Sequence, residues 1–189
     1  MARGRTDREV EQLRQRIVVE ATKLFADAGF KATSVQNIAD AVGIGKTLVL
    51  YHYPSKDLLR AAVVDQVAAL WMEMLPAFAG LGAADPAAAL APAIQALELR
   101  PWLSRFVMRE LLDRESGFAA ELRERLVPSA SSAGGRAWDP EVVAEWVFAA
   151  LSLLAVLAVF EPGKDGAGGI ELRGRVLAVA VRSAASAVR

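Results

Sequence analysis

The sequence contains no cysteine and only one histidine, His52. Without thiols the chain can form neither disulfides nor thiolate metal sites, a composition that fits a reducing cytosol. With one histidine, nucleophilic triads and most zinc sites are unavailable. The acidic pairs Glu110 with Asp113 and Glu121 with Glu124 are expected to be solvated helix faces near arginines. We therefore predict that the protein is not an enzyme and that it needs no metal or cofactor.

The sequence also lacks a hydrophobic run long enough for a membrane. The longest uncharged stretch, Trp146 to Phe160, is shorter than the roughly 20 residues that a spanning helix needs. The first residues, MARGRTDREVEQLRQR, have no apolar core of the kind found in signal peptides. These features predict a cytoplasmic protein with no membrane partner.

A net charge is likewise missing, because 22 basic residues balance 22 acidic ones. The balance differs along the chain. Residues 1–60 hold ten Lys and Arg against seven Asp and Glu, whereas the remainder holds 12 against 15. A mildly basic head on a mildly acidic body is the asymmetry expected when only the head contacts phosphate.

Apolar residues recur at three- and four-residue spacing, and no stretch alternates as a strand would. We predict an all-α protein of about nine helices, in which residues 1–54 form a DNA-binding head and residues 55–189 a helical domain for effector binding and dimerisation. Helices are expected over residues 8–28 and 55–75, with Pro76 ending the second. Further helices are expected from Trp102 to Arg114, from Gly117 to Val127 before Pro128, from Asp139 to Phe160, and over residues 170–188. The basic residues 1–9 are either a frayed tail or an arm that enters a minor groove.

The stretch from Thr33 to Lys56 predicts a helix-turn-helix. Its first helix is expected over Val35 to Val42, with the Thr33 hydroxyl as N-cap and Gln36 completing a capping box. Gly43 permits a tight turn, and the second helix runs from about Gly45 to His52. Such a second helix enters the major groove of DNA.

The polar and aromatic side chains of this stretch predict DNA contact. Lys46 and Lys56 are candidates for phosphate contacts, and Thr47 and Leu48 for base contacts, with Leu48 suited to a thymine methyl. Tyr51 and His52 would position the helix on the backbone. A plainer alternative is that Val49, Tyr51 and Tyr53 are core residues and His52 a surface histidine. The full set of DNA-binding candidates is Thr33, Ser34, Lys46, Thr47, Leu48, Tyr51, His52 and Lys56.

Residues 16–59 resemble the tetracycline-repressor (TetR) family of bacterial transcriptional regulators. The resemblance lies in Ile17 and Ala21 ahead of Leu24-Phe25, and in Gly29-Phe30, Thr33-Ser34-Val35, Ile38-Ala39, Gly43-Ile44, Lys46, Tyr51-His52-Tyr53 and Ser55-Lys56. There are departures: Gly45 stands where the family usually has serine or another capping residue, Thr47-Leu48 replaces a commoner pair, and Leu50 stands where the family usually has a phosphate-contacting tyrosine. The resemblance implies that the helix after Ser55 links an effector pocket to the head.

The second half of the chain suggests two further surfaces. Its last two predicted helices are apolar on all sides, so a two-fold homodimer would cover them, with monomer core as the alternative. The predicted interface residues are Leu151, Leu154, Ala155, Ala158, Val176, Val179 and Ala180. Aromatic and methionine side chains from several helices predict a largely apolar effector pocket, with core packing as the alternative. The pocket candidates are Trp71, Met74, Phe78, Trp102, Arg105, Phe106, Arg109 and Trp146.

Together these features predict a ligand-responsive transcriptional repressor. A homodimer would bind a palindromic double-stranded DNA operator, and a small apolar effector would release it. The alternative, suggested by Gly45 and Leu50, is a helical ligand-binding module with weakened or lost DNA contact.

Overall fold

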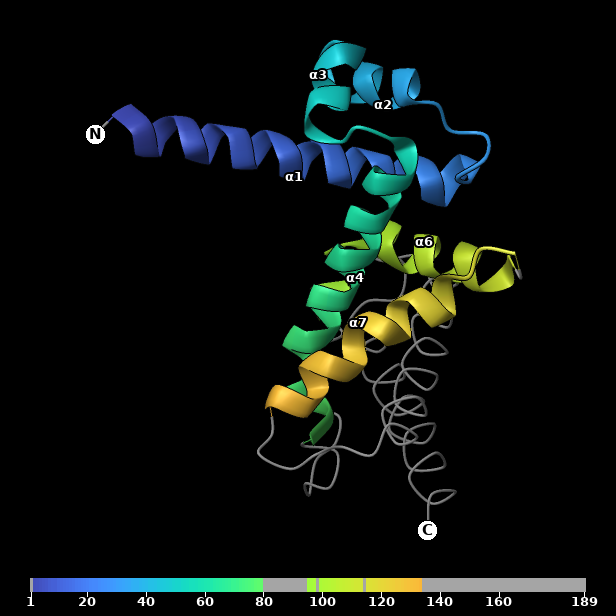
Figure 1. Cartoon of the computed structure of the whole chain (residues 1–189). Helices are drawn as coiled ribbons and strands as arrows, with labels where there is room; N and C mark the ends of the chain where they lie inside the picture. The colour runs from blue at the N-terminus through green and yellow to red at the C-terminus, as the bar shows by residue number, and fades with distance from the viewer. Residues whose placement is uncertain (1, 80–94, 98, 114, 134–189) are drawn as a thin grey trace. The chain divides into compact units, whose positions relative to one another are not determined.

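The computed structural model describes residues 2–79, 95–97, 99–113 and 115–133 (Figure 1). Its helices are α1 (Ala2–Ala28), α2 (Val35–Val42), α3 (Lys46–His52), α4 (Lys56–Ala79), α6 (Pro101–Leu112) and α7 (Phe118–Ala133). The described part contains helices and no strand, so the all-α prediction is confirmed. The helices predicted over residues 139–160 and 170–188 lie outside the described residues. No described helix is long and apolar enough to cross a membrane.

The chain forms two compact units, Met1–Gln66 and Val67–Arg189. In the first unit α2 packs against α1 and against α3 (Figure 1). Its core combines apolar side chains from all four helices, among them Ile17, Phe25, Ile38, Val49 and Leu59, each no more than 1% exposed. The predicted boundary between a DNA-binding head of residues 1–54 and a second domain of residues 55–189 stays a prediction.

Helix α1 begins at Ala2, six residues before the predicted start at Arg8. Residues 2–8 contain no proline, and their single glycine, Gly4, costs a helix only about 1 kcal/mol relative to alanine. Residues 7–12 are all exposed. The N-terminal residues are thus the first turns of a helix, which argues against the predicted arm in a minor groove. A helix about 10–12 Å wide does not fit a minor groove about 6 Å wide.

Helices α4 and α7 both continue past the prolines that were predicted to end them. Helix α4 runs beyond Pro76 to Ala79, and α7 runs beyond Pro128 to Ala133. Both predictions are wrong, because a proline removes one backbone donor without requiring that a long helix stop there.

In the second unit α6 contacts α7, and the ring of Phe106 meets that of Phe118 edge-on at 5.8 Å between centroids. Gly117 turns the chain between them with a φ of 65°. The Ser116 hydroxyl donates to the Glu110 carbonyl at 2.8 Å and accepts from the Phe118 N–H at 3.2 Å, so it links the last turn of α6 to the first residue of α7. Glu110 is only 5% exposed, which corrects the prediction that its pair with Asp113 is a solvated face.

Candidate nucleic-acid interface

The N-cap of α2 lies one residue later in the chain than the sequence predicts. The N-cap is Ser34, whose hydroxyl accepts from the Asn37 N–H at 3.1 Å, while the Asn37 side chain accepts from the Ser34 N–H at 2.9 Å. This capping box uses Ser34 and Asn37, not Thr33 and Gln36. The bounds Val35–Val42 are confirmed.

Thr33 belongs to the interior of the head. Its side chain is 3% exposed, and its hydroxyl donates to the Gly29 carbonyl at 2.8 Å and lies 3.2 Å from the Leu24 carbonyl. These bonds close the loop between α1 and α2. The hydroxyl is therefore not placed to contact DNA, and the prediction that the Thr33 side chain is a DNA contact is corrected.

The turn between α2 and α3 depends on Gly43. Gly43 has a φ of 77°, a left-handed conformation that favours glycine, and its N–H donates to the Ala39 and Asp40 carbonyls. The Ile44 N–H also donates to Ala39, at 3.0 Å. This pattern is a Schellman motif, which ends α2 and turns the chain at once into α3.

Helix α3 has one buried side chain and a continuous exposed face. Val49 is 1% exposed and anchors the helix to the head. Lys46, Thr47 and Leu48 in the first turn are exposed, Leu48 to 40%, and Tyr51 in the second turn is 77% exposed. The alternative that Tyr51 is a core residue is therefore excluded, and these four side chains form what we call the outer face of α3.

The two tyrosines at the end of α3 have opposite environments. Tyr51 points outward and its ring meets the half-buried His52 ring edge-on at 5.2 Å. Tyr53 is 7% exposed and lies 5.0 Å from the guanidinium carbon of Arg14 on α1. Burial raises the pKa of Tyr53 above its usual 10.0, and the Arg14 charge opposes this shift. Tyr53 is thus a core residue, as the plainer alternative proposed for it.

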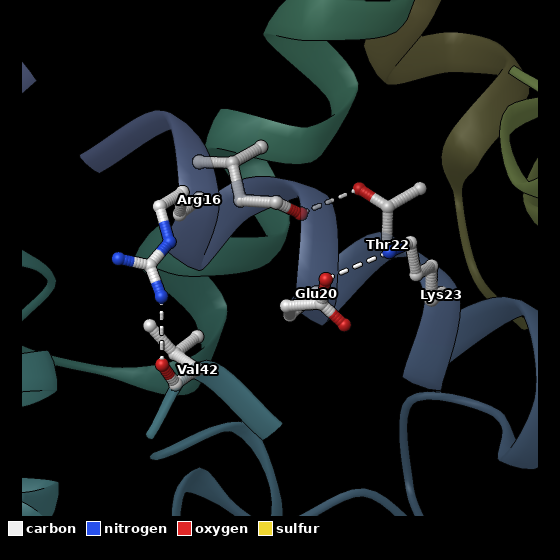
Figure 2. Close-up of polar contacts among 6 residues, drawn as sticks. Arg16, Glu20, Thr22, Lys23 and Val42 are labelled. Carbon is white, nitrogen blue, oxygen red and sulfur yellow. Dashed lines mark hydrogen bonds and ion pairs between the residues drawn. The ribbon is translucent and has the colours of Figure 1, made fainter. Parts of the chain in front are cut away.

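An arginine on α1 holds the far end of α2. The Arg16 guanidinium donates to the Val42 carbonyl at 2.9 Å (Figure 2). Because that carbonyl is in the last turn of α2, the positive charge also favours the negative end of the helix dipole. Figure 2 also shows two contacts within α1, between Lys23 and Glu20 at 2.7 Å and from the Thr22 hydroxyl to the Val18 carbonyl at 2.7 Å. Sequence patterning did not indicate the role of Arg16, since its acceptor is a backbone atom 26 residues away.

Lys56, predicted to contact phosphate, is engaged within the head. Its Nζ donates to the Phe30 carbonyl at 2.8 Å and to the Thr33 carbonyl at 3.0 Å. An ammonium has three N–H donors, so one remains for a further acceptor. Ser34 is exposed and its hydroxyl serves the cap of α2.

The predicted effector residues divide into buried and exposed groups. Trp71 on α4 and Phe106 on α6 are buried, and Trp102 is half-buried. Arg105 and Arg109 are exposed, and their assignment to an effector pocket remains a prediction. The buried polar residues of α6 are instead Ser104 and Glu110, which sequence patterning did not select. Nothing is described of the Met74 and Phe78 side chains, and Trp146 lies outside the described residues.

All seven predicted interface residues lie outside the described residues: Leu151, Leu154, Ala155, Ala158, Val176, Val179 and Ala180. The dimer surface therefore remains a prediction.

Comparison with known proteins finds a family match for the head. Residues 17–63 match the model of the bacterial regulatory proteins of the tetR family. This match covers the capping of α2, the turn at Gly43, α3 and the start of α4. Residues 17–63 are therefore similar to the DNA-binding head of the TetR family of bacterial regulatory proteins. The resemblance predicted from residues 16–59 is confirmed.

The chain also has relatives in sequence and in fold. The chain is 36% identical over 75 residues to the HTH-type transcriptional regulator RutR of Escherichia coli K12, a match covering 40% of this chain and 35% of that protein. It thus aligns with about a third of the length of that relative. A TetR-like regulator from Rhodococcus sp. RHA1 has a TM-score of 0.57 at 21% identity, covering 92% of this chain and 96% of that one. A tetR-family regulator from Streptomyces coelicolor has a TM-score of 0.57 at 18% identity, covering 93% and 80% respectively.

The N-cap of α3 leads to a first prediction. Gly45 makes no side-chain cap, has an extended conformation (φ −72°), and has open space where a Cβ would stand. A serine there would accept from an N–H of the first turn. We expect Gly45→Ser to be more stable than Gly45→Ala by about 1 kcal/mol in thermal unfolding, and at least as stable as the parent.

A substitution at Gly43, the glycine in the turn between α2 and α3, is the control for this prediction. Gly43→Ala should destabilise the head by about 1 kcal/mol, because the residue there must adopt a positive φ. Equal stabilities of Gly45→Ser and Gly45→Ala would contradict the capping argument.

Arg16 leads to a second prediction. Arg16→Met should destabilise the head by about 1–2 kcal/mol, because it leaves the part-buried Val42 carbonyl without its charged donor. Hydrogen exchange of the last turn of α2 should quicken accordingly. Arg8→Met, at an exposed position of the same helix, is the control and should change stability by less than about 0.5 kcal/mol. Indistinguishable effects of the two variants would show that the Arg16 bond contributes nothing.

Proposed function

We propose that this protein is a cytoplasmic transcriptional repressor of the TetR family that binds a palindromic operator as a homodimer and is released by a small, largely apolar effector. The observation that carries the proposal is the outer face of α3. A seven-residue helix keeps a single side chain, Val49, for the core and leaves Lys46, Thr47, Leu48 and Tyr51 exposed. The match of residues 17–63 to the tetR family model supports the same interpretation.

In this proposal each group on the outer face has a distinct role. Lys46 contacts a phosphate as a point charge, and Thr47 and Leu48 face base edges from the first turn of α3. Tyr51 and His52 rest against the backbone at the end of the helix, and Ser34 stands at the N-terminus of α2, where N–H groups favour a phosphate. A two-fold dimer would set two such helices on half-sites about 34–36 Å apart.

The effector part of the proposal rests on the second unit. Trp71 and Phe106 supply buried aromatic surface from two helices, and Ser104 and Glu110 are buried polar groups on α6. An effector that fits such a lining is mostly apolar with few polar atoms. Its binding shifts the DNA-binding equilibrium only through a difference in affinity between two conformations, typically about 1–3 kcal/mol.

Selection of bound sequences from random duplex DNA by the full chain tests the DNA-binding part. We expect an enriched inverted repeat, and sedimentation should give a dimer at micromolar concentration. A thermal-shift screen of apolar small molecules, followed by operator titration with each hit, tests effector release. If no sequence is enriched while ligands still raise the melting temperature, the protein is instead a ligand-binding module without DNA contact. The uncapped α3 at Gly45 is the observation that favours this second candidate.

A further inference from the structure

Lys56, the first residue of α4, joins two parts of the head that are distant in sequence. Its Nζ donates to the Phe30 carbonyl at 2.8 Å and to the Thr33 carbonyl at 3.0 Å, across 26 and 23 residues. Both acceptors belong to the loop between α1 and α2. Charge-assisted bonds of this kind are roughly twice as strong as bonds between neutral groups.

The Phe30 ring strengthens this attachment. Nζ of Lys56 lies 4.3 Å from the ring centroid, and the guanidinium carbon of Arg60, one turn later on α4, lies 5.9 Å from it. The ring also meets Phe25 of the α1 core edge-on, with centroids 5.4 Å apart. The loop is therefore held between the core of α1 and the cationic start of α4.

The attachment of the loop to α4 also positions the start of α2. Thr33 is fixed to Gly29 by its own N–H at 3.2 Å and by its hydroxyl at 2.8 Å, so the loop is closed. The next residue, Ser34, is the N-cap of α2. The start of α2 is therefore one residue from a carbonyl that Lys56 holds.

The first turn of α4 is thus connected to both ends of the helix-turn-helix. Tyr53, Pro54 and Ser55 join it covalently to the end of α3, and Lys56 joins it by hydrogen bonds to the start of α2. Among the hydrogen bonds described in the head, those of Lys56 attach the start of α4 directly to the loop that precedes α2.

We propose that Lys56 is a positioning residue that ties the start of α2 to the start of α4, so that the helix-turn-helix keeps its geometry for DNA when α4 moves. The relevance of Lys56 to DNA binding rests on the proposed function. The hydrogen bonds from Lys56 to the loop are a property of the protein without DNA. Because two of its three donors are used inside the head, Lys56 acts chiefly by holding the loop, and a phosphate contact is secondary.

The test compares Lys56→Met, which keeps the aliphatic length, with Lys56→Arg, which keeps the charge and several donors. Hydrogen exchange of the free full-length protein should be about tenfold faster over residues 30–38 in Lys56→Met than in the parent, and restored to within about threefold in Lys56→Arg. Lys23→Met, on α1, is the matched control and should leave exchange in this segment unchanged.

Operator binding supplies the second readout. Lys56→Met should weaken binding several-fold, with the slope of log affinity against log salt within about 0.5 of the parent. Loss of a phosphate contact from each subunit of a dimer would instead flatten that slope by about 2, and this result with unchanged exchange would overturn the proposal. Unchanged exchange by itself would also overturn it.

Two outcomes separate this proposal from the proposed function. If the parent protein binds no DNA, the proposed function fails while the exchange measurement still decides whether Lys56 holds the loop. If Lys56→Met does not fold, Lys56→Gln replaces it, because the amide keeps a neutral donor. Its exchange over residues 30–38 should then be intermediate, and parent-like exchange would reject the tie.

Discussion

Replacement of Phe25 by alanine is expected to destabilise the head by about 3–5 kcal/mol. Phe25 is 1% exposed in the core and meets the Phe30 ring edge-on at 5.4 Å. The loss combines the transfer free energy of the ring with the cavity left behind. Small domains are stable by only about 5–15 kcal/mol, so this single change removes a large share of that stability. Hydrogen exchange in residues 1–66 should accelerate by about two to four orders of magnitude, as this free-energy range implies.

Tyr51→Ala is the matched control for Phe25→Ala. Tyr51→Ala also removes a six-membered aromatic ring from the head, but this ring is 77% exposed. We expect a change in stability below about 0.5 kcal/mol, together with weaker DNA binding. Similar losses of stability in the two variants would mean that burial of Phe25 does not hold the head together.

Replacement of Lys46 by alanine is expected to weaken binding to every DNA sequence. One phosphate contact contributes about −0.9 to the slope of log affinity against log salt, so a dimer that loses two contacts should have a slope flatter by about 2. The affinities of the variant and the parent should converge near 1 M salt and differ on the order of 30-fold at 0.15 M. Fluorescence anisotropy titrations at several salt concentrations measure both quantities.

Lys23→Ala is the control for the Lys46 variant, because it changes the net charge equally. Lys23 lies on α1, paired with Glu20 at 2.7 Å. Its removal should change the slope by less than about 0.5. If the two variants lose affinity to the same extent, a general loss of positive charge would account for the result, and the outer face of α3 would not be the contact surface.

Short-range sequence patterns were sufficient to predict the α2 helix and the turn that follows it. The apolar spacing of Val35, Ile38, Ala39 and Val42 fits one buried face of a short helix, and the structure has a helix with those bounds. Gly43 marked the turn because few other residues adopt a positive φ cheaply. Such signals act within four or five residues, and they can therefore be recognised in sequence.

Interactions between distant residues could not be recognised in the same way. Thr33 and Ser34 are neighbouring hydroxyl residues with similar capping preference, and the burial of Thr33 against Gly29 decides that Ser34 is the cap. On α6 the sequence drew attention to Arg105 and Arg109, which are exposed, whereas the buried polar residues of the helix are Ser104 and Glu110. Helical spacing places residues on a common face without saying which face is covered.

The amino-acid sequence alone determined the resemblance of the head to the TetR family, the helical class and the turn between α2 and α3, because each depends on short-range patterns of polarity, glycine and caps. Tertiary structure alone decided which lysine faces outward. Lys46 and Lys56 look alike in sequence, yet Lys46 is exposed on α3, whereas Lys56 donates to carbonyls 23 and 26 residues away. The physical reason is that an ammonium binds whatever acceptors the fold brings within about 3 Å, and those acceptors are backbone atoms that exist at every position of the chain.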